Sequence, residues 1–171
     1  MAQEGANVAI FDLPHVREDM ATLKHEIEDA YKVKCLVVEC DVTNEEKVIE
    51  SVQLVATEFG QIDYLFNNAG YQGLFTTTDN YPTDDFKKVM DVNVTGVFQV
   101  LKAVVQHMKK VKRGSIVQTA SMAGVSVPPN MLAYATSKAA VIGMTKTAAK
   151  DLAPLNIRVN SISPAFIGPG S

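Results

Sequence analysis

Tyr134 and Lys138 stand four residues apart in the stretch 132–152, whose composition favours a helix. Four residues are just over one helical turn, so both side chains would lie on the same face. An ammonium beside a phenol stabilises the phenolate and lowers the pKa of a phenol from about 10 toward the range useful for proton transfer at neutral pH. A surface pair of no function is the equal alternative when the spacing is taken alone.

Ser121 precedes Tyr134 by thirteen residues and ends a predicted strand over 115–121. Open parallel sheets bind ligands at the carboxyl ends of their strands. A hydroxyl at this position could hold a substrate oxygen next to the phenol. The alternative is that Ser121 only caps the turn that begins at Met122.

Two other polar features of the sequence could also carry chemistry. The run Asn67-Asn68-Ala69-Gly70 ends a predicted strand, and its small residues would let a flat ligand ring approach the backbone, although a plain turn explains it as well. Asn93 stands in an apolar helical stretch, so its amide needs partners. It either bridges helices or opens the helix locally and holds a water.

Asp12 ends the first predicted strand. A carboxylate there could accept hydrogen bonds from an adenosine ribose and repel a 2′-phosphate. The alternative is a cap on the helix that follows.

The elements that must position these residues alternate along the chain. Apolar runs predict strands at 7–12, 35–40, 62–67, 115–121 and 157–162, and three-and-four spacing predicts helices at 15–32, 44–59, 83–111 and 132–152. Strands that alternate with long helices form βαβ units with right-handed crossovers. We therefore expect a single domain over 1–171, an α/β fold with a doubly wound parallel sheet.

Composition excludes several classes of partner. The 19 acidic and 16 basic side chains form no basic run, which argues against nucleic acid and anionic membrane surfaces. No apolar run reaches the ~18 residues of a membrane span, and the first residues do not resemble a signal peptide, so we expect a cytoplasmic protein.

The histidines and cysteines lack metal-site spacing, so we assign no metal. Cys35 and Cys40 would lie about 16 Å apart on one strand and cannot pair.

Taken together, four motifs resemble those of the short-chain dehydrogenase/reductase family over nearly the whole chain. They are Asp41-Val42-Thr43, the NNAG run 67–70, the run DVNVTG at 91–96, and Ser121, Tyr134 and Lys138 in Ser-x12-Tyr-x3-Lys spacing. The resemblance implies a Rossmann-like fold and hydride transfer between a nicotinamide cofactor and an alcohol or carbonyl.

The resemblance also implies roles for individual residues. Tyr134 would be the general acid/base, Lys138 would lower its pKa and bind the nicotinamide ribose, and Ser121 would hold the reacting oxygen. Asn93 would anchor a proton-relay water, and Asp12 would select NAD over NADP. The implied cofactor contacts are Asp12, Asp41, Val42, Asn68, Ala69, Gly70, Tyr134, Lys138, Pro164 and Ile167.

Within the family, several runs are most similar to bacterial NAD-dependent xylitol and related polyol dehydrogenases; they include NNAGYQGLF, YPTDDF and DLAPLNIRVNSISP. A polyol such as xylitol is therefore the expected small-molecule substrate. The second expectation is a reductase of 3-oxoacyl thioesters or other ketones. A third, of another class, is a non-catalytic truncated product or inactive homologue. Family members commonly pair through the helices that correspond to 83–111 and 132–152, so a dimer or tetramer is expected.

The chain departs from the family pattern near both ends. No Thr-Gly-x3-Gly-x-Gly turn occurs in it, and Ala165 and Pro169 replace the glycine and threonine expected after Pro164. We therefore expect truncation at both ends, with the first, central strand, the glycine-rich turn and the C-terminal strand missing. The first strand would lie in the centre of the sheet, between the predicted strands 7–11 and 62–67. Its absence would leave backbone groups of these two strands unpaired, unless the two strands pair with each other or with another chain.

Overall fold

The computed structural model of the chain describes residues 1–165. Its strands are β1 (Val8–Asp12), β2 (Cys35–Glu39), β3 (Tyr64–Asn67), β4 (Gly114–Thr119) and β5 (Ile157–Ile162). Its main helices are α1 (Arg17–Tyr31), α2 (Glu45–Phe59), α3 (Thr83–Met90), α4 (Val97–Val111) and α5 (Leu132–Leu152). The predicted alternation of strands and helices is confirmed, with boundaries that shift by a few residues.

All paired strands run parallel. β1 pairs with β2, and β3, β4 and β5 form a second sheet in that order. In the second sheet Asn67 is level with Gln118, and Thr119 is level with Ile162. The carboxyl ends of β3, β4 and β5 therefore meet at one edge, where the residues that follow each strand can lie together.

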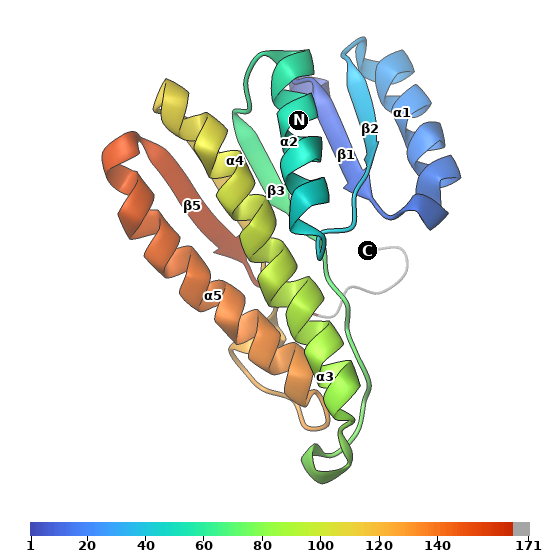
Figure 1. The fold of residues 1–171 in the computed structure, drawn as a ribbon, viewed down its shortest axis with the longest axis vertical. Coiled ribbons are helices and arrows are strands. Elements are labelled where there is room, and N and C mark those ends of the chain that lie inside the picture. Colours follow the sequence, from blue (N-terminus) through green and yellow to red (C-terminus); the bar gives the residue numbers. More distant parts are fainter. Residues whose placement is uncertain (166–171) are drawn as a thin grey trace.

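Strands β1 and β3 face each other across the interval between the two sheets (Figure 1). Within residues 1–165 they form no strand pair with one another. The aromatic side chains of Tyr64 and Phe66 on β3 are more than half exposed as a result. The expectation that these two strands keep unpaired edges is confirmed for the described part of the chain.

Three helices cover one face of the larger sheet, with α4 between α2 and α5 (Figure 1). Asn44 begins α2 by accepting a hydrogen bond from the Lys47 backbone N–H, and Gly60 ends it in the left-handed conformation at φ +79°. The core between these helices and the sheet contains Val48, Val52, Val100, Leu101, Val104, Met108, Ile116, Ile157 and Val159. Burial of this apolar surface fixes α4 and α5 over the sheet.

The predicted continuous helix over 83–111 is interrupted. A π-helical segment, Asp91–Gly96, separates α3 from α4. Gly96 packs so closely on Val42 that an added Cβ would lie 2.7 Å from Val42 Cγ2. Such π segments widen a helix locally and often mark functional positions. The local opening of the helix at Asn93 is therefore confirmed, and the single unbroken helix was wrong.

Cys35 and Cys40 are buried free thiols. In the part of the chain that the structure describes, His, Cys, Asp and Glu side chains form no group of three that could hold a metal ion. None of the described helices combines the length and the apolar character that crossing a membrane requires.

Candidate active site

Lys138 is buried at the sheet edge where β4 ends. Its ammonium donates a hydrogen bond of 2.8 Å to the Thr119 carbonyl oxygen, and its side chain is 2% exposed. The same nitrogen lies 5.6 Å from the centroid of the Tyr134 ring, one turn earlier in α5. Burial lowers the pKa of Lys138. The predicted same-face pairing of the phenol and the ammonium is present.

Asn93 is fully buried in the π-helical segment, and both of its amide atoms are bonded. Oδ1 accepts the Tyr71 backbone N–H at 2.7 Å, and Nδ2 donates to the Tyr71 carbonyl at 2.9 Å. Nδ2 also donates to the Ser137 hydroxyl at 2.9 Å. The helix opens at Asn93 and the Asn93 side chain bridges the 71 segment to α5, so parts of both interpretations are confirmed. The water assigned to Asn93 stays a prediction.

The sequence did not reveal the role of Ser137. Its hydroxyl is fully buried, accepts from Asn93 and donates to the Tyr134 carbonyl at 2.7 Å. Ser137 therefore connects Asn93 to the helical turn that carries Tyr134. The sequence feature that could have revealed Ser137 is its position as a small polar residue next to Lys138, on a helix whose other buried residues are mostly apolar.

Gly70 lies between Asn93 and Lys138. A Cβ added there would stand 3.4 Å from Lys138 Nζ and 3.6 Å from Asn93 Oδ1. The backbone at Gly70 therefore lies close to both an ammonium and an amide oxygen. Glycine at this position lets other groups approach the backbone.

Ser121 follows β4 and caps a turn. Its hydroxyl oxygen accepts the Ala123 backbone N–H at 3.1 Å, which leaves the hydroxyl hydrogen to donate. The Met122 N–H donates to the Pro164 carbonyl at 3.0 Å, so the turn is tied to the end of β5. The turn-cap interpretation is confirmed, and it does not remove the hydroxyl from chemistry.

The turn after Ser121 lies directly on α5. A Cβ at Gly124 would come within 2.7 Å of the Lys138 carbonyl carbon and of the Ala139 nitrogen. Only a residue without a side chain permits this contact. Gly124 was missed from the sequence, where Met-Ala-Gly reads as an ordinary turn.

The NNAG run joins two strands and a helix. Asn67 is buried, and its Nδ2 donates to the Val97 carbonyl at 2.9 Å. Asn68 Oδ1 accepts the Thr119 hydroxyl at 2.8 Å, which links the ends of β3 and β4. Ala69 and Gly70 follow β3, with Gly70 beside Lys138. The plain-turn interpretation was wrong, because residues 68–70 form no turn, and the run instead links the end of β3 to α4, β4 and Lys138.

The remaining predicted cofactor residues lie at neighbouring strand ends. Asp12 is exposed at the end of β1, where Oδ1 accepts the Leu13 N–H at 2.8 Å. Asp41 Oδ1 accepts both the backbone N–H and the hydroxyl of Thr43, at 2.9 and 2.8 Å. Val42 packs against Gly96, and Ile167 lies outside the described residues.

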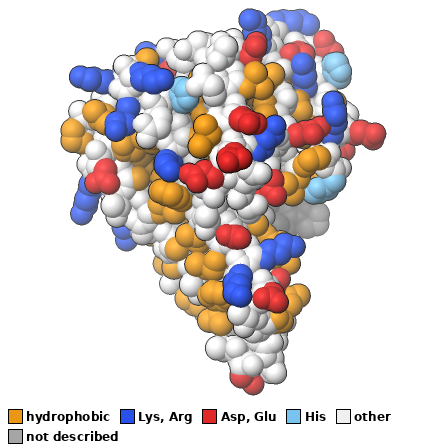
Figure 2. All heavy atoms as spheres, viewed as in Figure 1, with side chains coloured by type: hydrophobic (Ala, Val, Ile, Leu, Met, Phe, Trp, Pro, Cys, Tyr) orange, Lys and Arg blue, Asp and Glu red, His pale blue; other side chains and the backbone are white. Residues whose placement is uncertain are grey.

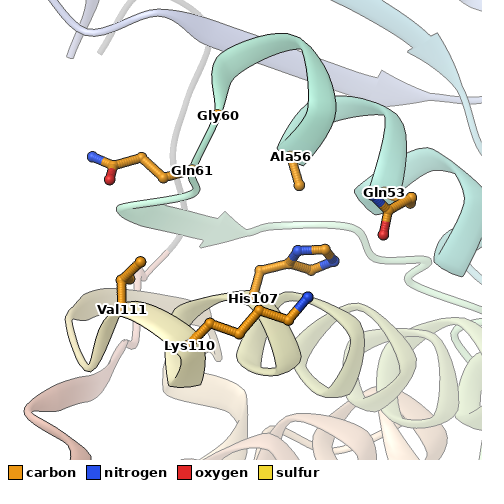
Figure 3. Close-up of a pocket in the computed structure, with 7 residues that line it drawn as sticks. All are labelled: Gln53, Ala56, Gly60, Gln61, His107, Lys110 and Val111. Atoms are coloured by element: carbon orange, nitrogen blue, oxygen red, sulfur yellow. The ribbon is translucent and has the colours of Figure 1, made fainter.

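A separate hollow of about 220 Å³ lies between α2 and α4, bordered by Gln53, His107 and Lys110 (Figure 3). None of Asn93, Ser121, Tyr134 and Lys138 lines it. The chemistry-bearing residues instead gather at the carboxyl edge of β3, β4 and β5, which we take as the candidate site.

Comparison with known proteins covers almost all of the chain. The family described as short chain dehydrogenase matches residues 1–170. A 3-oxoacyl-[acyl-carrier-protein] reductase, FabG, from Thermotoga maritima is 42% identical over 171 residues, which are 97% of this chain and 66% of that protein. A 3-alpha-(or 20-beta)-hydroxysteroid dehydrogenase from Mycobacterium bovis is 36% identical over 98% of this chain and 62% of its own length.

Solved structures give the same result. NAD+-bound xylitol dehydrogenase superposes with a TM-score of 0.95 at 53% identity, over 99% of this chain and 64% of that one. A structure described as ElxO with NADP bound gives a TM-score of 0.89 at 30% identity, over 98% of this chain and 66% of that one. The chain thus spans just under two thirds of the length of these relatives. Its Rossmann-like α/β fold of parallel strands, its motifs and its match over residues 1–170 make it a member of the short-chain dehydrogenase family.

Proposed function

We propose that the protein transfers hydride reversibly between NAD(H) and a secondary alcohol or ketone. The observation that carries this proposal is the buried Lys138 ammonium, 5.6 Å from the centroid of the Tyr134 ring and close to the backbone of Gly70. When bound, a nicotinamide cofactor would accept or supply the hydride. The residues of the chain then have to bind the substrate, orient it and move one proton.

Tyr134 is the proton-transfer group in this proposal. As the substrate carbinol carbon loses hydride, its hydroxyl proton passes to the Tyr134 phenolate, and in the reverse direction the phenol returns it. Lys138 supplies a positive charge 5.6 Å from the centroid of the Tyr134 ring. Ser121 donates its free hydroxyl hydrogen to the reacting oxygen, and Asn93 anchors the chain of groups through which the proton exchanges with solvent.

Cofactor contacts follow from the positions of the strand ends. In this proposal Asp41 and Val42 after β2, Asn68, Ala69 and Gly70 after β3, and Pro164 after β5 would contact the cofactor. Asp12 favours NAD, because an exposed carboxylate at the end of β1 accepts ribose hydroxyls and repels a 2′-phosphate. The relatives include both NAD-bound and NADP-bound proteins, so cofactor preference requires its own test.

A polyol such as xylitol is the proposed substrate, supported by 53% identity to xylitol dehydrogenase against 42% to the 3-oxoacyl thioester reductase. The thioester reductase is the second candidate, favoured by the exposed apolar residues Leu74 and Phe75 in the segment that follows Gly70. Turnover of the full-length protein on xylitol, sorbitol and a 3-oxoacyl thioester separates the two. Preference for the thioester would reject the polyol.

Tyr134→Phe tests the proposed chemistry. The ring stays and the hydroxyl is lost, so we expect turnover to fall by about 10²-fold or more with NADH affinity nearly unchanged. Titration calorimetry with NADH measures the affinity. Normal turnover by Tyr134→Phe would reject Tyr134 as the proton-transfer group, and absence of turnover on every alcohol and ketone by the unaltered protein would favour a non-catalytic homologue.

We further propose that the chain forms a single domain and that the protein is cytoplasmic. We also propose that it pairs with a second copy of itself through α4 and α5. Figure 2 shows apolar side chains gathered over the lower part of these helices. Phe98 on α4 is 47% exposed, and α5 presents the small exposed residues Ala139 and Gly143. Apolar surface next to small residues lets two helices approach closely.

A further inference from the structure

The segment 71–76, which follows Gly70, is held by one carboxylate. Asp85, in the first turn of α3, accepts a hydrogen bond from the Tyr71 hydroxyl at 3.0 Å on Oδ1. Its Oδ2 accepts the Tyr81 hydroxyl at 2.7 Å and the Leu74 backbone N–H at 3.0 Å. Both oxygens are therefore used, and the segment is tied at two points to the helix before Asn93.

The close approach of this segment to α3 depends on Gly73. Its φ is +72°, and an added Cβ would lie 2.5 Å from the Tyr81 hydroxyl and 2.9 Å from Asp85 Oδ2. The ammonium of Lys88, also on α3, lies 4.6 Å from the centroid of the Tyr71 ring. The side chain of Tyr71 is therefore held by Asp85 and Lys88, both on α3.

The backbone of Tyr71 holds Asn93. Its N–H donates to Asn93 Oδ1 at 2.7 Å, and its carbonyl accepts from Asn93 Nδ2 at 2.9 Å. The Asn93 amide therefore bonds to the backbone of Tyr71, whose side-chain hydroxyl bonds to Asp85. The hydrogen bonds that Asp85 accepts, led by that from Tyr81, hold the pKa of this carboxyl below its usual range, so it is ionised at neutral pH.

We propose that Asp85 is a positioning residue of the active site, acting through Tyr71 on the orientation of the Asn93 amide. The proposal rests on the proposed function, because it assigns Asp85 to the proton-transfer geometry of that reaction. A simpler role would be favourable charge at the N-terminus of α3. Asp84 shares that role, because it precedes Asp85 in the first turn of α3. Within residues 1–165 its one ion pair is with Lys87, at 3.7 Å.

Asp85→Ala and Asp84→Ala in the full-length protein distinguish the two roles. We expect Asp85→Ala to lower kcat by about 10- to 100-fold with little change in the KM for NADH, because small displacements of reacting groups have effects of this size. Asp84→Ala should retain kcat. Equal kcat values for the two variants, with both folded by circular dichroism, would overturn the proposal.

Tyr71→Phe provides a second variant if Asp85→Ala does not fold. It removes one hydrogen bond to Asp85 and leaves those of Leu74 and Tyr81. We expect a fall in kcat of about tenfold at most. Asp85→Asn, which retains one acceptor oxygen, should recover part of the activity lost in Asp85→Ala; no recovery relative to Asp85→Ala would count against the proposal.

A spectroscopic measurement separates failure of this inference from failure of the proposed function. In asparagine-labelled protein, the side-chain amide of Asn93 should exchange faster with solvent in Asp85→Ala and Tyr71→Phe than in Asp84→Ala. This holds whether or not any alcohol is turned over. Unchanged exchange in all three variants would show that Asp85 does not orient Asn93.

Discussion

Lys138 Nζ lies 5.6 Å from the centroid of the Tyr134 ring and donates a hydrogen bond to the Thr119 carbonyl, and within residues 1–165 it has no carboxylate partner. A buried ammonium without a carboxylate partner is costly, because desolvation disfavours the charged form. Its positive charge therefore remains available to a neighbouring phenolate. This is the arrangement expected if charge at Lys138 serves proton transfer at Tyr134.

The first prediction concerns the charge of Lys138. Lys138→Met keeps a long apolar side chain in the buried position and removes the ammonium. We expect kcat to fall by about 10²- to 10⁴-fold while the thermal midpoint changes little, because the loss of one hydrogen bond is offset by the loss of a desolvated charge. Steady-state kinetics and thermal denaturation of the same preparation check this. A kcat within a few-fold of the unaltered protein would contradict it.

The second prediction concerns cofactor selection by Asp12. Asp12→Ser removes the carboxylate that would repel a 2′-phosphate, so the ratio of kcat/KM for NADP to that for NAD should rise about 10- to 100-fold, or about 1.4–2.8 kcal/mol. Glu39→Gln is the control, because Glu39 lies level with Asp12 on β2 and forms an ion pair with Arg17 at 3.1 Å. An equal change in both variants would show a general charge effect.

The third prediction concerns the contact of Gly124 with α5. Gly124→Ala places a Cβ 2.7 Å from the backbone of Lys138, so the helix has to move. We expect the free energy of unfolding to fall by about 1–3 kcal/mol, measured by urea denaturation. Gly143→Ala is the matched control, since an added Cβ there has no atom within 4 Å and raises helix propensity. Similar stabilities for the two variants would refute the contact.

The fourth prediction concerns His107, which lines the hollow between α2 and α4 (Figure 3). Burial, with a smaller contribution from Lys110, lowers the pKa of His107. The unfolded chain then binds a proton more readily than the folded chain, so stability is complete above about pH 6.5 and falls as pH drops through the folded pKa.

His107→Gln should remove this part of the acid dependence. Thermal midpoints between about pH 7.5 and pH 5 measure it. His25→Gln, on the exposed face of α1, should leave the acid dependence in place. If the His107→Gln midpoint declines with acid as steeply as that of the unaltered protein, the assignment is wrong.

The fifth prediction concerns the proposed pairing of copies. Phe98→Glu puts a charge on the exposed apolar part of α4 and should convert a dimer or tetramer to a smaller species, measured by light scattering after size-exclusion chromatography. Leu23→Glu is the control, because Leu23 is similarly exposed on α1. A mass unaffected by Phe98→Glu would exclude α4 from the interface.

Local patterns in the sequence were enough to predict the secondary structure. Apolar runs and three-and-four spacing located the strands and helices, because burial of an apolar face imposes those periods regardless of the rest of the fold. The helix over 83–111 was the exception. Its apolar pattern continues through 91–96, whereas the packing of Gly96 on Val42 accompanies a π-helical segment there. A periodicity cannot report such a contact between distant residues.

The sequence by itself also predicted which residues carry chemistry, since the types and spacing of Ser121, Tyr134 and Lys138 resemble a family motif. Only the tertiary structure decided how these groups are supported. Ser137, Gly124 and Asp85 act through contacts between segments far apart in the chain, such as the hydrogen bond of Asn93 to Ser137. Small or common polar residues have no distinctive pattern, and their importance comes from close approach in space.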